Sequence, residues 1–303
     1  MIDRRSFLEF AAMSALAGGC RALASGGSER VPYGETVGDR LWMWGHHAMS
    51  FAAQLERKCN YNLPLERRID MADACRTMGI PGCFVVRWFN LPRKRDLDDY
   101  MRQFADTRRV GFSITDGAEE TVEEKIRLGL GLADRMPNLT SFVMDDFWCK
   151  STKRPPMSAL HRLRTELDAR GMKLSVVLYA DQNGLKREYR EVIDLCDEVT
   201  FWFWHGKNVR TIEDQVGRLK DLIGADKPVL LGQYMYDFGA KRELPGQLME
   251  AQLAATTRLL AGRAIDGVIF HCTPLVDMDL DAVRLSREWI RAHARERWGA
   301  GTI

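Results

Sequence analysis

The chain has 303 residues, of which 46% are hydrophobic and 28% are charged, the composition of an ordinary globular protein with one large core. Its 44 Lys and Arg residues against 42 Asp and Glu residues leave a formal net charge of +2. This balance excludes the basic excess expected of a nucleic-acid-binding protein, and we expect no nucleic-acid partner and no cofactor.

Residues 1–25 predict an export signal that precedes the folded domain. Arg4 and Arg5 stand before Ser6–Leu8 and a short apolar segment, and this pattern resembles a twin-arginine signal. The apolar segment is too short to span a bilayer. Cys20 follows small residues and resembles a lipoprotein cleavage site, so a lipid on Cys20 would be the only membrane contact. We therefore expect a periplasmic or membrane-anchored protein, with an amphipathic N-terminal helix as the alternative.

Residues 26–303 predict a single α/β domain. Eight short apolar segments alternate with segments of helical period, which is typical of repeated β-α units around a parallel sheet. The expected strands are Leu41–Gly45, Gly82–Arg87, Val110–Ile114, Thr140–Asp145, Leu174–Tyr179, Glu198–Phe203, Val229–Tyr234 and Gly267–His271. Eight such units predict a (β/α)8 barrel, and an open doubly wound sheet is the alternative.

Helices are expected between these strands, where apolar residues recur at helical spacing. Ile212, Val216, Leu219 and Ile223 form one such stripe. Gly171 follows another helical segment at the position where a left-handed residue commonly ends a helix. These signals place the helices on the outside of the sheet.

The seven cysteines are scattered and include no Cys-x-x-Cys pair, which argues against a zinc knuckle. Cys75, Cys83 and Cys272 fall within apolar patterns, where a free cysteine behaves as a small buried hydrophobe. We expect mostly free thiols.

Histidines and tryptophans gather at the ends of the expected strands, where the active sites of such barrels lie. Aromatic rings stack on the C–H face of a sugar, while acids and imidazoles bind its hydroxyl groups, so the pattern favours a carbohydrate ligand. The expected binding residues are Trp44, His46, Trp88, Asp116, Trp148, Tyr179, Asp181, Trp204, His205, Tyr234, Tyr236 and His271.

Asp145 and Asp146 stand side by side at the end of the fourth expected strand. Two carboxylates that share a desolvated pocket cannot both ionise cheaply, so one is expected to keep a raised pKa and act as an acid. Glycosidic cleavage needs a second carboxylate, for which Asp237 is preferred and Asp181 is held in reserve. In the alternative interpretation one aspartate caps the following loop and the other pairs with Arg87 or Lys150.

The segment Phe142–Trp148 resembles the fourth-strand motif of glycoside-hydrolase-like barrels, including exported glycosyl-hydrolase-like lipoproteins whose motif reads Asp-Asp-Tyr-Phe. The resemblance implies a glycoside hydrolase with its acid/base at Asp145 or Asp146; Asp146 is preferred. The commonest clan places glutamates after strands four and seven. Neither position carries Glu here, and Asp237 is the nearest counterpart after strand seven.

Two other functions remain open at this stage. A metal-dependent hydrolase would use His46, His205 and His271 with aspartates, although His46 and His47 are adjacent and would diverge on a strand. A barrel that binds carbohydrate without catalysis is the second. The long segment Ala48–Asn62 is expected to wall the cleft in either case.

Overall fold

The computed structural model describes residues 33–56, 60–65, 69–116, 119–149, 152, 154–180 and 185–299. The predicted export signal, Cys20, Asp181 and Lys150 lie outside the described residues, so these predictions stay as they are.

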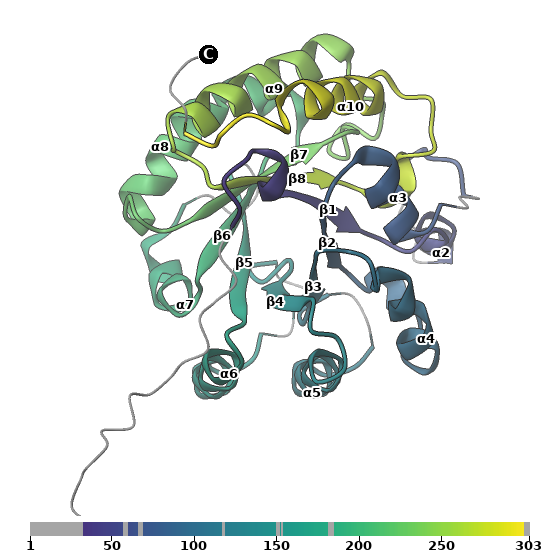
Figure 1. Ribbon diagram of the computed structural model, residues 1–303, viewed down its shortest axis with the longest axis vertical. Coiled ribbons are helices and arrows are strands. Elements are labelled where there is room, and N and C mark those ends of the chain that lie inside the picture. Colours follow the sequence, from purple (N-terminus) through teal and green to yellow (C-terminus); the bar gives the residue numbers. More distant parts are fainter. Residues whose placement is uncertain are drawn as a thin grey trace, which may run out of the picture.

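Eight parallel strands form one closed barrel in the order of the sequence, from β1 through β8 and back to β1 (Figure 1). The (β/α)8 barrel is therefore confirmed. The strands are β1 Leu41–Gly45, β2 Gly82–Val85, β3 Arg109–Ser113, β4 Leu139–Met144, β5 Lys173–Tyr179, β6 Glu198–Trp202, β7 Val229–Tyr234 and β8 Gly267–His271. Their side chains are almost all buried, because one face meets the helices and the other fills the barrel.

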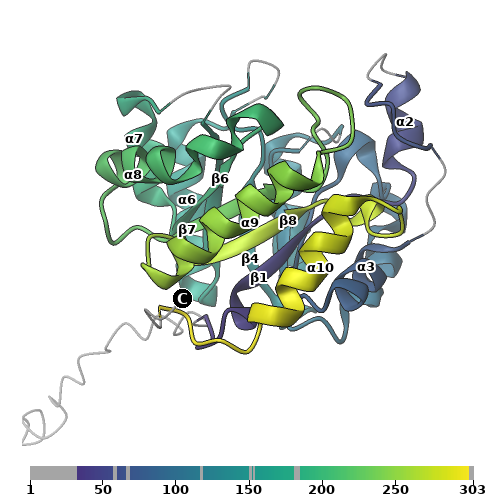
Figure 2. The same cartoon turned by 90° about the horizontal axis from the view of Figure 1, so that it is seen from above.

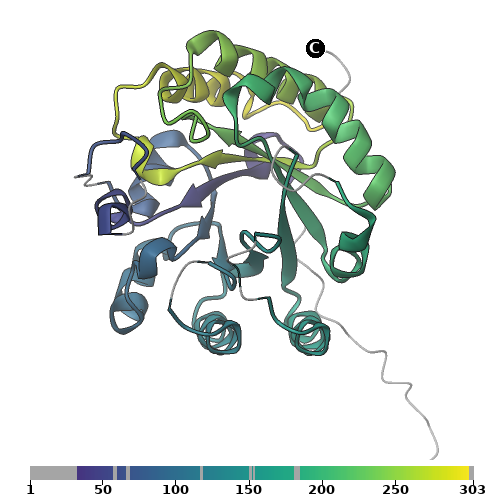
Figure 3. The same cartoon turned by 180° about the vertical axis from the view of Figure 1, so that it is seen from behind.

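The helices surround the barrel, and the view from behind shows the same outer layer (Figure 3). They are α2 Ser50–Glu56, α3 Met71–Met78, α4 Leu97–Met101, α5 Val122–Ala133, α6 Met157–Arg170, α7 Arg190–Leu195, α8 Ile212–Ile223, α9 Gly246–Ala261 and α10 Asp281–His293. Figure 2 shows α9 and α10 side by side on the outside of the barrel. Two helices, α2 and α3, separate β1 from β2, so the alternation is not strict there.

The local signals in the sequence act as predicted. Gly171 ends α6 with φ 65° and ψ 24°, the left-handed conformation that glycine adopts without steric cost. The stripe Ile212, Val216, Leu219 and Ile223 is the buried face of α8. Every helix in the described part of the chain is too short or too polar to cross a bilayer.

Large aromatic side chains fill the barrel from its amino-terminal end to its middle. Trp42 stacks on Phe84 with ring centroids 4.4 Å apart. Trp202 occupies the space above Gly232, where a Cβ atom would lie 2.0 Å from the indole. The amino-terminal end is closed by Tyr33, whose hydroxyl donates to the fully buried Glu198 over 2.6 Å. These side chains fill the barrel between its amino-terminal end and the carboxyl ends of the strands.

Candidate active site

A cavity of about 650 Å³ lies at the carboxyl ends of the strands. All eight strands or the loops directly after them contribute to its lining, as the barrel geometry requires. The predicted site residues that line it are Trp44, His46, Trp88, Asp116, Asp145, Asp146, Tyr179, Trp204, Tyr234 and His271. Residues spread over 228 positions of sequence thus meet around one cavity, because closure of the barrel brings β8 beside β1.

Four predicted site residues lie elsewhere in the molecule. Trp148 stacks on Tyr189 at 3.7 Å between ring centroids, and His205 packs against Gly239. Tyr236 is buried and donates its hydroxyl hydrogen to the backbone oxygen of Tyr61. Tyr236 lies two residues beyond Tyr234, but β7 ends at Tyr234 and the extended period is lost beyond it.

Asp237, the fourth of these residues, is also outside the cavity lining. Its carboxylate accepts a hydrogen bond from the Ala240 backbone N–H over 2.9 Å, and its own backbone pairs with Arg242. Asp237 therefore stabilises the turn after β7 and does not face Asp145 and Asp146 as a second catalytic carboxylate.

Several lining residues were missed in the sequence. Phe238 and Phe89 belong to loops without a pattern that marks them. Trp202 lines the cavity from below and contacts Trp44 edge-on at 5.1 Å. Tyr61 lies at the end of the long segment after β1, whose length was the signal for a cleft wall, and it lines the cavity as that signal indicates.

The Asp145–Asp146 pair follows β4 directly, and both residues line the cavity. Successive side chains on a strand would point apart, but the strand has ended at Met144 and Asp146 adopts a left-handed φ of 47°. Thr152 and the Cys149 N–H donate to the Asp146 carbonyl over 2.8 Å each and hold this turn. Such a conformation in a residue other than glycine costs free energy and is often found at functional sites.

Both carboxyl groups of the pair have raised pKa values. Burial, the charge of Asp146 and the charge of Asp116 raise the pKa of Asp145 well above its ordinary range. Burial also raises the pKa of Asp146, although a hydrogen bond from the Tyr179 hydroxyl, at 3.0 Å, acts in the opposite direction. Because the charge of Asp146 raises the pKa of Asp145, the two groups titrate as one system.

A network of buried ion pairs lies beside the Asp145–Asp146 pair. Asp116 accepts from the Arg87 backbone N–H over 3.0 Å and pairs with Lys125 at 2.8 Å. The Arg87 guanidinium is fully buried and makes two 3.0 Å contacts with the Glu120 carboxylate. The alternative interpretation that Asp145 or Asp146 pairs with Arg87 is therefore wrong, because the partner of Arg87 is Glu120.

The opposite wall of the cavity is aromatic. His46 stacks on Trp88 with centroids 4.9 Å apart, and His271 lies 4.7 Å from the Tyr234 ring. Burial lowers the pKa of His46 to about 3, and burial together with His46 lowers the pKa of His271 well below its usual range. Both imidazoles are therefore neutral at physiological pH, and the wall carries no charge from them.

No family model matches the chain, and no curated protein matches it. Among solved structures it resembles tryptophan synthase alpha-subunits from Pyrococcus furiosus. One mutant of that subunit is 11% identical with a TM-score of 0.47, and another is 11% identical with a TM-score of 0.49. Both alignments cover 85% of this chain and 98% of the other. Likeness at this level carries no argument about activity.

The predicted glycoside hydrolase is wrong. No family model and no curated protein that would support a glycosidase matches the chain, and from the resemblance to glycosyl-hydrolase-like lipoproteins only the barrel is borne out. Within the molecule, every carboxylate in the described lining comes from the β4 end, from the segment between β3 and α5, or from the first turn of α5. The second carboxylate that was expected across the cavity is absent from the described lining, because Asp237 lies in its own turn. The alternative metal-dependent hydrolase site was to use His46, His205 and His271, but His205 does not line the cavity.

Proposed function

We propose that the cavity is the active site of an enzyme in which the Asp145–Asp146 pair transfers protons to and from a small substrate. The observation that carries this proposal is the pair itself: two adjacent carboxyl groups with raised pKa values line one aromatic cavity. In such a pair the carboxyl group with the higher pKa can act as an acid and its ionised neighbour as a base, so the same pair offers both functions.

The lining favours a neutral ring compound with hydroxyl groups, such as a sugar. Trp44, Trp88 and Trp204 offer aromatic surface for the C–H face of a ring. Lys125 is held by Asp116, and Arg154 is exposed at the rim, so the described lining brings no cluster of cations to bind a phosphate group. Hydroxyl groups would instead meet the carboxyl pair and the Tyr179 hydroxyl.

The placement of the acids favours a reaction that adds a proton and removes one on the same face of the substrate. Isomerisation and elimination are reactions of this kind. Asp145, which has the more strongly raised pKa, would donate its proton to a substrate oxygen, and Asp146 would accept a proton from carbon or oxygen. Tyr179 would hold Asp146 in position through its 3.0 Å hydrogen bond.

Proton NMR in D2O tests this function directly. Monosaccharides and sugar acids are incubated with the protein, and loss of a C–H signal or appearance of a product is followed. The wild-type protein is expected to act on at least one compound, and Asp145→Asn and Asp146→Asn are each expected to slow it by about 100-fold or more. Asp237→Asn is the matched control, since Asp237 is a buried aspartate outside the cavity. Absence of exchange with every compound, or full activity in both pair variants, contradicts the proposal.

We also propose that the protein is exported, on the basis of Arg4, Arg5 and the small residues before Cys20. Fractionation of cells that produce the full chain tests this. Substitution of Arg4 and Arg5 by Lys is expected to retain the protein in the cytoplasm, and substitution of Cys20 by Ala is expected to abolish any lipid attachment.

A further inference from the structure

Three side chains with metal-binding atoms meet where β8 closes the barrel against β1. His271 is the last residue of β8 and lies opposite Trp44 of β1 in the parallel register. His46 follows β1, and its backbone is fixed to the β8 end because Thr273 both accepts from His46 N–H, at 2.9 Å, and donates to His46 O, at 2.7 Å. Cys272 follows His271 directly.

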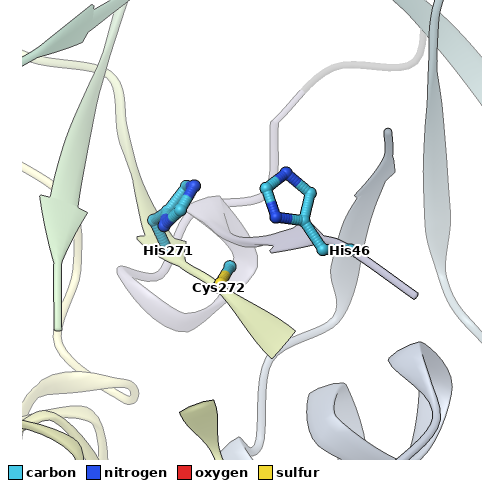
Figure 4. A group of neighbouring side chains, drawn as sticks. All are labelled: His46, His271 and Cys272. Atoms are coloured by element: carbon cyan, nitrogen blue, oxygen red, sulfur yellow. The ribbon is translucent and has the colours of Figure 1, made fainter. Parts of the chain in front are cut away.

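The three residues form a compact and shielded group. One nitrogen from each histidine and the Cys272 sulfur all lie within 4.8 Å of one another. His46 is 6% exposed, His271 is 7% exposed and Cys272 is fully buried. Figure 4 shows the two imidazole rings side by side with the Cys272 side chain beneath them.

One ring nitrogen of each histidine in this group makes no hydrogen bond within the described part of the chain. Nδ1 of His46 and Nδ1 of His271 are buried, and neither has a hydrogen-bond partner in the described part of the chain. A buried polar atom without a partner lowers the stability of the folded protein. Two rings that each carry an unpartnered buried nitrogen, grouped with a buried thiol, are an arrangement that a bound cation would satisfy.

We propose that His46, His271 and Cys272 bind a divalent metal ion of the zinc type. One thiolate and two imidazoles suit Zn²⁺ or Co²⁺, whereas Mg²⁺ and Ca²⁺ require oxygen ligands. This ligand set differs from the predicted hydrolase site because Cys272 replaces His205, and it departs from the expectation of no metal.

Three protein ligands leave a fourth position on a tetrahedral ion. His46 and His271 both line the cavity, so the fourth ligand is a water molecule or a substrate atom from that side. Bonds of about 2.0–2.3 Å place neighbouring donors about 3.5 Å apart, so binding draws the three side chains together by roughly 1 Å. The Cys272 thiol binds as a thiolate and its proton passes to solvent. The site stands independently of the acid–base role proposed for Asp145 and Asp146.

Co²⁺ titration of the full chain tests the site without any assay of activity. The protein is first freed of metal with a chelator, and Co²⁺ is added while the absorption spectrum is recorded. We expect one Co²⁺ per chain, strong visible bands of a tetrahedral ion, and a near-ultraviolet band of thiolate-to-cobalt charge transfer. Cys272→Ala is expected to lose the charge-transfer band and at least about 100-fold in affinity.

Cys196→Ala is the matched control, because Cys196 is also a buried free thiol but lies at the end of α7, away from the cavity. This variant is expected to keep the spectrum of the wild-type protein. X-ray absorption of the Zn²⁺-loaded wild-type chain needs no variant and is expected to give one sulfur near 2.3 Å and nitrogens near 2.0–2.1 Å. A wild-type protein without the charge-transfer band, a band that survives in Cys272→Ala, or a zinc shell without sulfur would overturn the proposal.

Discussion

The Tyr179 hydroxyl, at the end of β5, donates a hydrogen bond to Asp146 Oδ1 over 3.0 Å. The bond links two neighbouring strand ends and, together with a hydrogen bond from Cys149, opposes the rise that burial causes in the pKa of Asp146. Because the hydroxyl stabilises the ionised carboxylate, it lowers the pKa of Asp146 against the effect of burial.

Replacement of this tyrosine tests that role. Tyr179→Phe is expected to raise the pKa of Asp146 further, since the donor to the charged form is lost, and to destabilise the protein by about 1 kcal/mol. Carbon NMR of labelled aspartate carboxyl groups measures the pKa in the folded protein. Tyr189→Phe is a suitable control, because Tyr189 stacks on Trp148 away from the pair. An unchanged titration of Asp146 in Tyr179→Phe would show that the hydrogen bond is not made.

The raised pKa of Asp145 predicts a particular dependence of stability on pH. Between the ordinary pKa of an unfolded aspartate, about 3.9, and the raised pKa in the folded state, the folded protein binds more protons than the unfolded chain. The free energy of unfolding therefore falls as pH rises through this window. Asp145→Asn cannot ionise at this position, so we expect it to reduce this decline and to stabilise the protein above the window by about 0.5–2 kcal/mol.

Urea denaturation at a series of pH values measures this effect. Asp98→Asn is the control, because Asp98 is an exposed aspartate of α4 and its replacement should leave the decline in place. A wild-type protein whose stability is flat or rising across the window would contradict a protonated Asp145.

The buried Arg87–Glu120 pair predicts a large asymmetry between single and double substitutions. Glu120→Ala leaves the fully buried guanidinium without its carboxylate and is expected to cost about 3–5 kcal/mol. The double variant Arg87→Met with Glu120→Leu removes both charges and should recover much of this loss. Glu119→Ala, at the exposed neighbouring position, is expected to change stability by less than about 0.5 kcal/mol. Chemical denaturation of the wild-type protein and the three variants measures these differences, and equal stability of Glu120→Ala and Glu119→Ala would refute the prediction.

Two glycine substitutions distinguish the effect of core packing on stability from the effect of backbone freedom. Gly232→Ala places a methyl group 2.0 Å from the Trp202 ring in the filled barrel and is expected to cost about 1–3 kcal/mol or more. Gly217→Ala lies in α8 with no atom within 4 Å of the new Cβ and is expected to stabilise by about 0.5–1 kcal/mol. Thermal unfolding of both variants measures the difference. Destabilisation by Gly217→Ala, or none by Gly232→Ala, would contradict this packing.

The strand ends show why part of the site could be predicted and part could not. Trp44, Asp145 and His271 stand at or directly beyond strands, where the barrel rule places them in the cavity whatever the loops do. Tyr236 and Asp237 lie beyond the end of β7, where the chain turns, and a period of two no longer tells which way a side chain points. Phe238, one residue further, enters the cavity instead.

The sequence alone determined the eight β-α units and hence the barrel, because hydrophobic periodicity and helix-ending residues are local properties of the chain. It also placed two carboxyl groups side by side after β4. Only the tertiary structure decided that both line one cavity, that Asp237 is held in its own turn, and that Cys272 joins His46 and His271. These outcomes depend on loop conformation and on the meeting of β8 with β1, which are contacts between residues far apart in the sequence, and no local pattern encodes them.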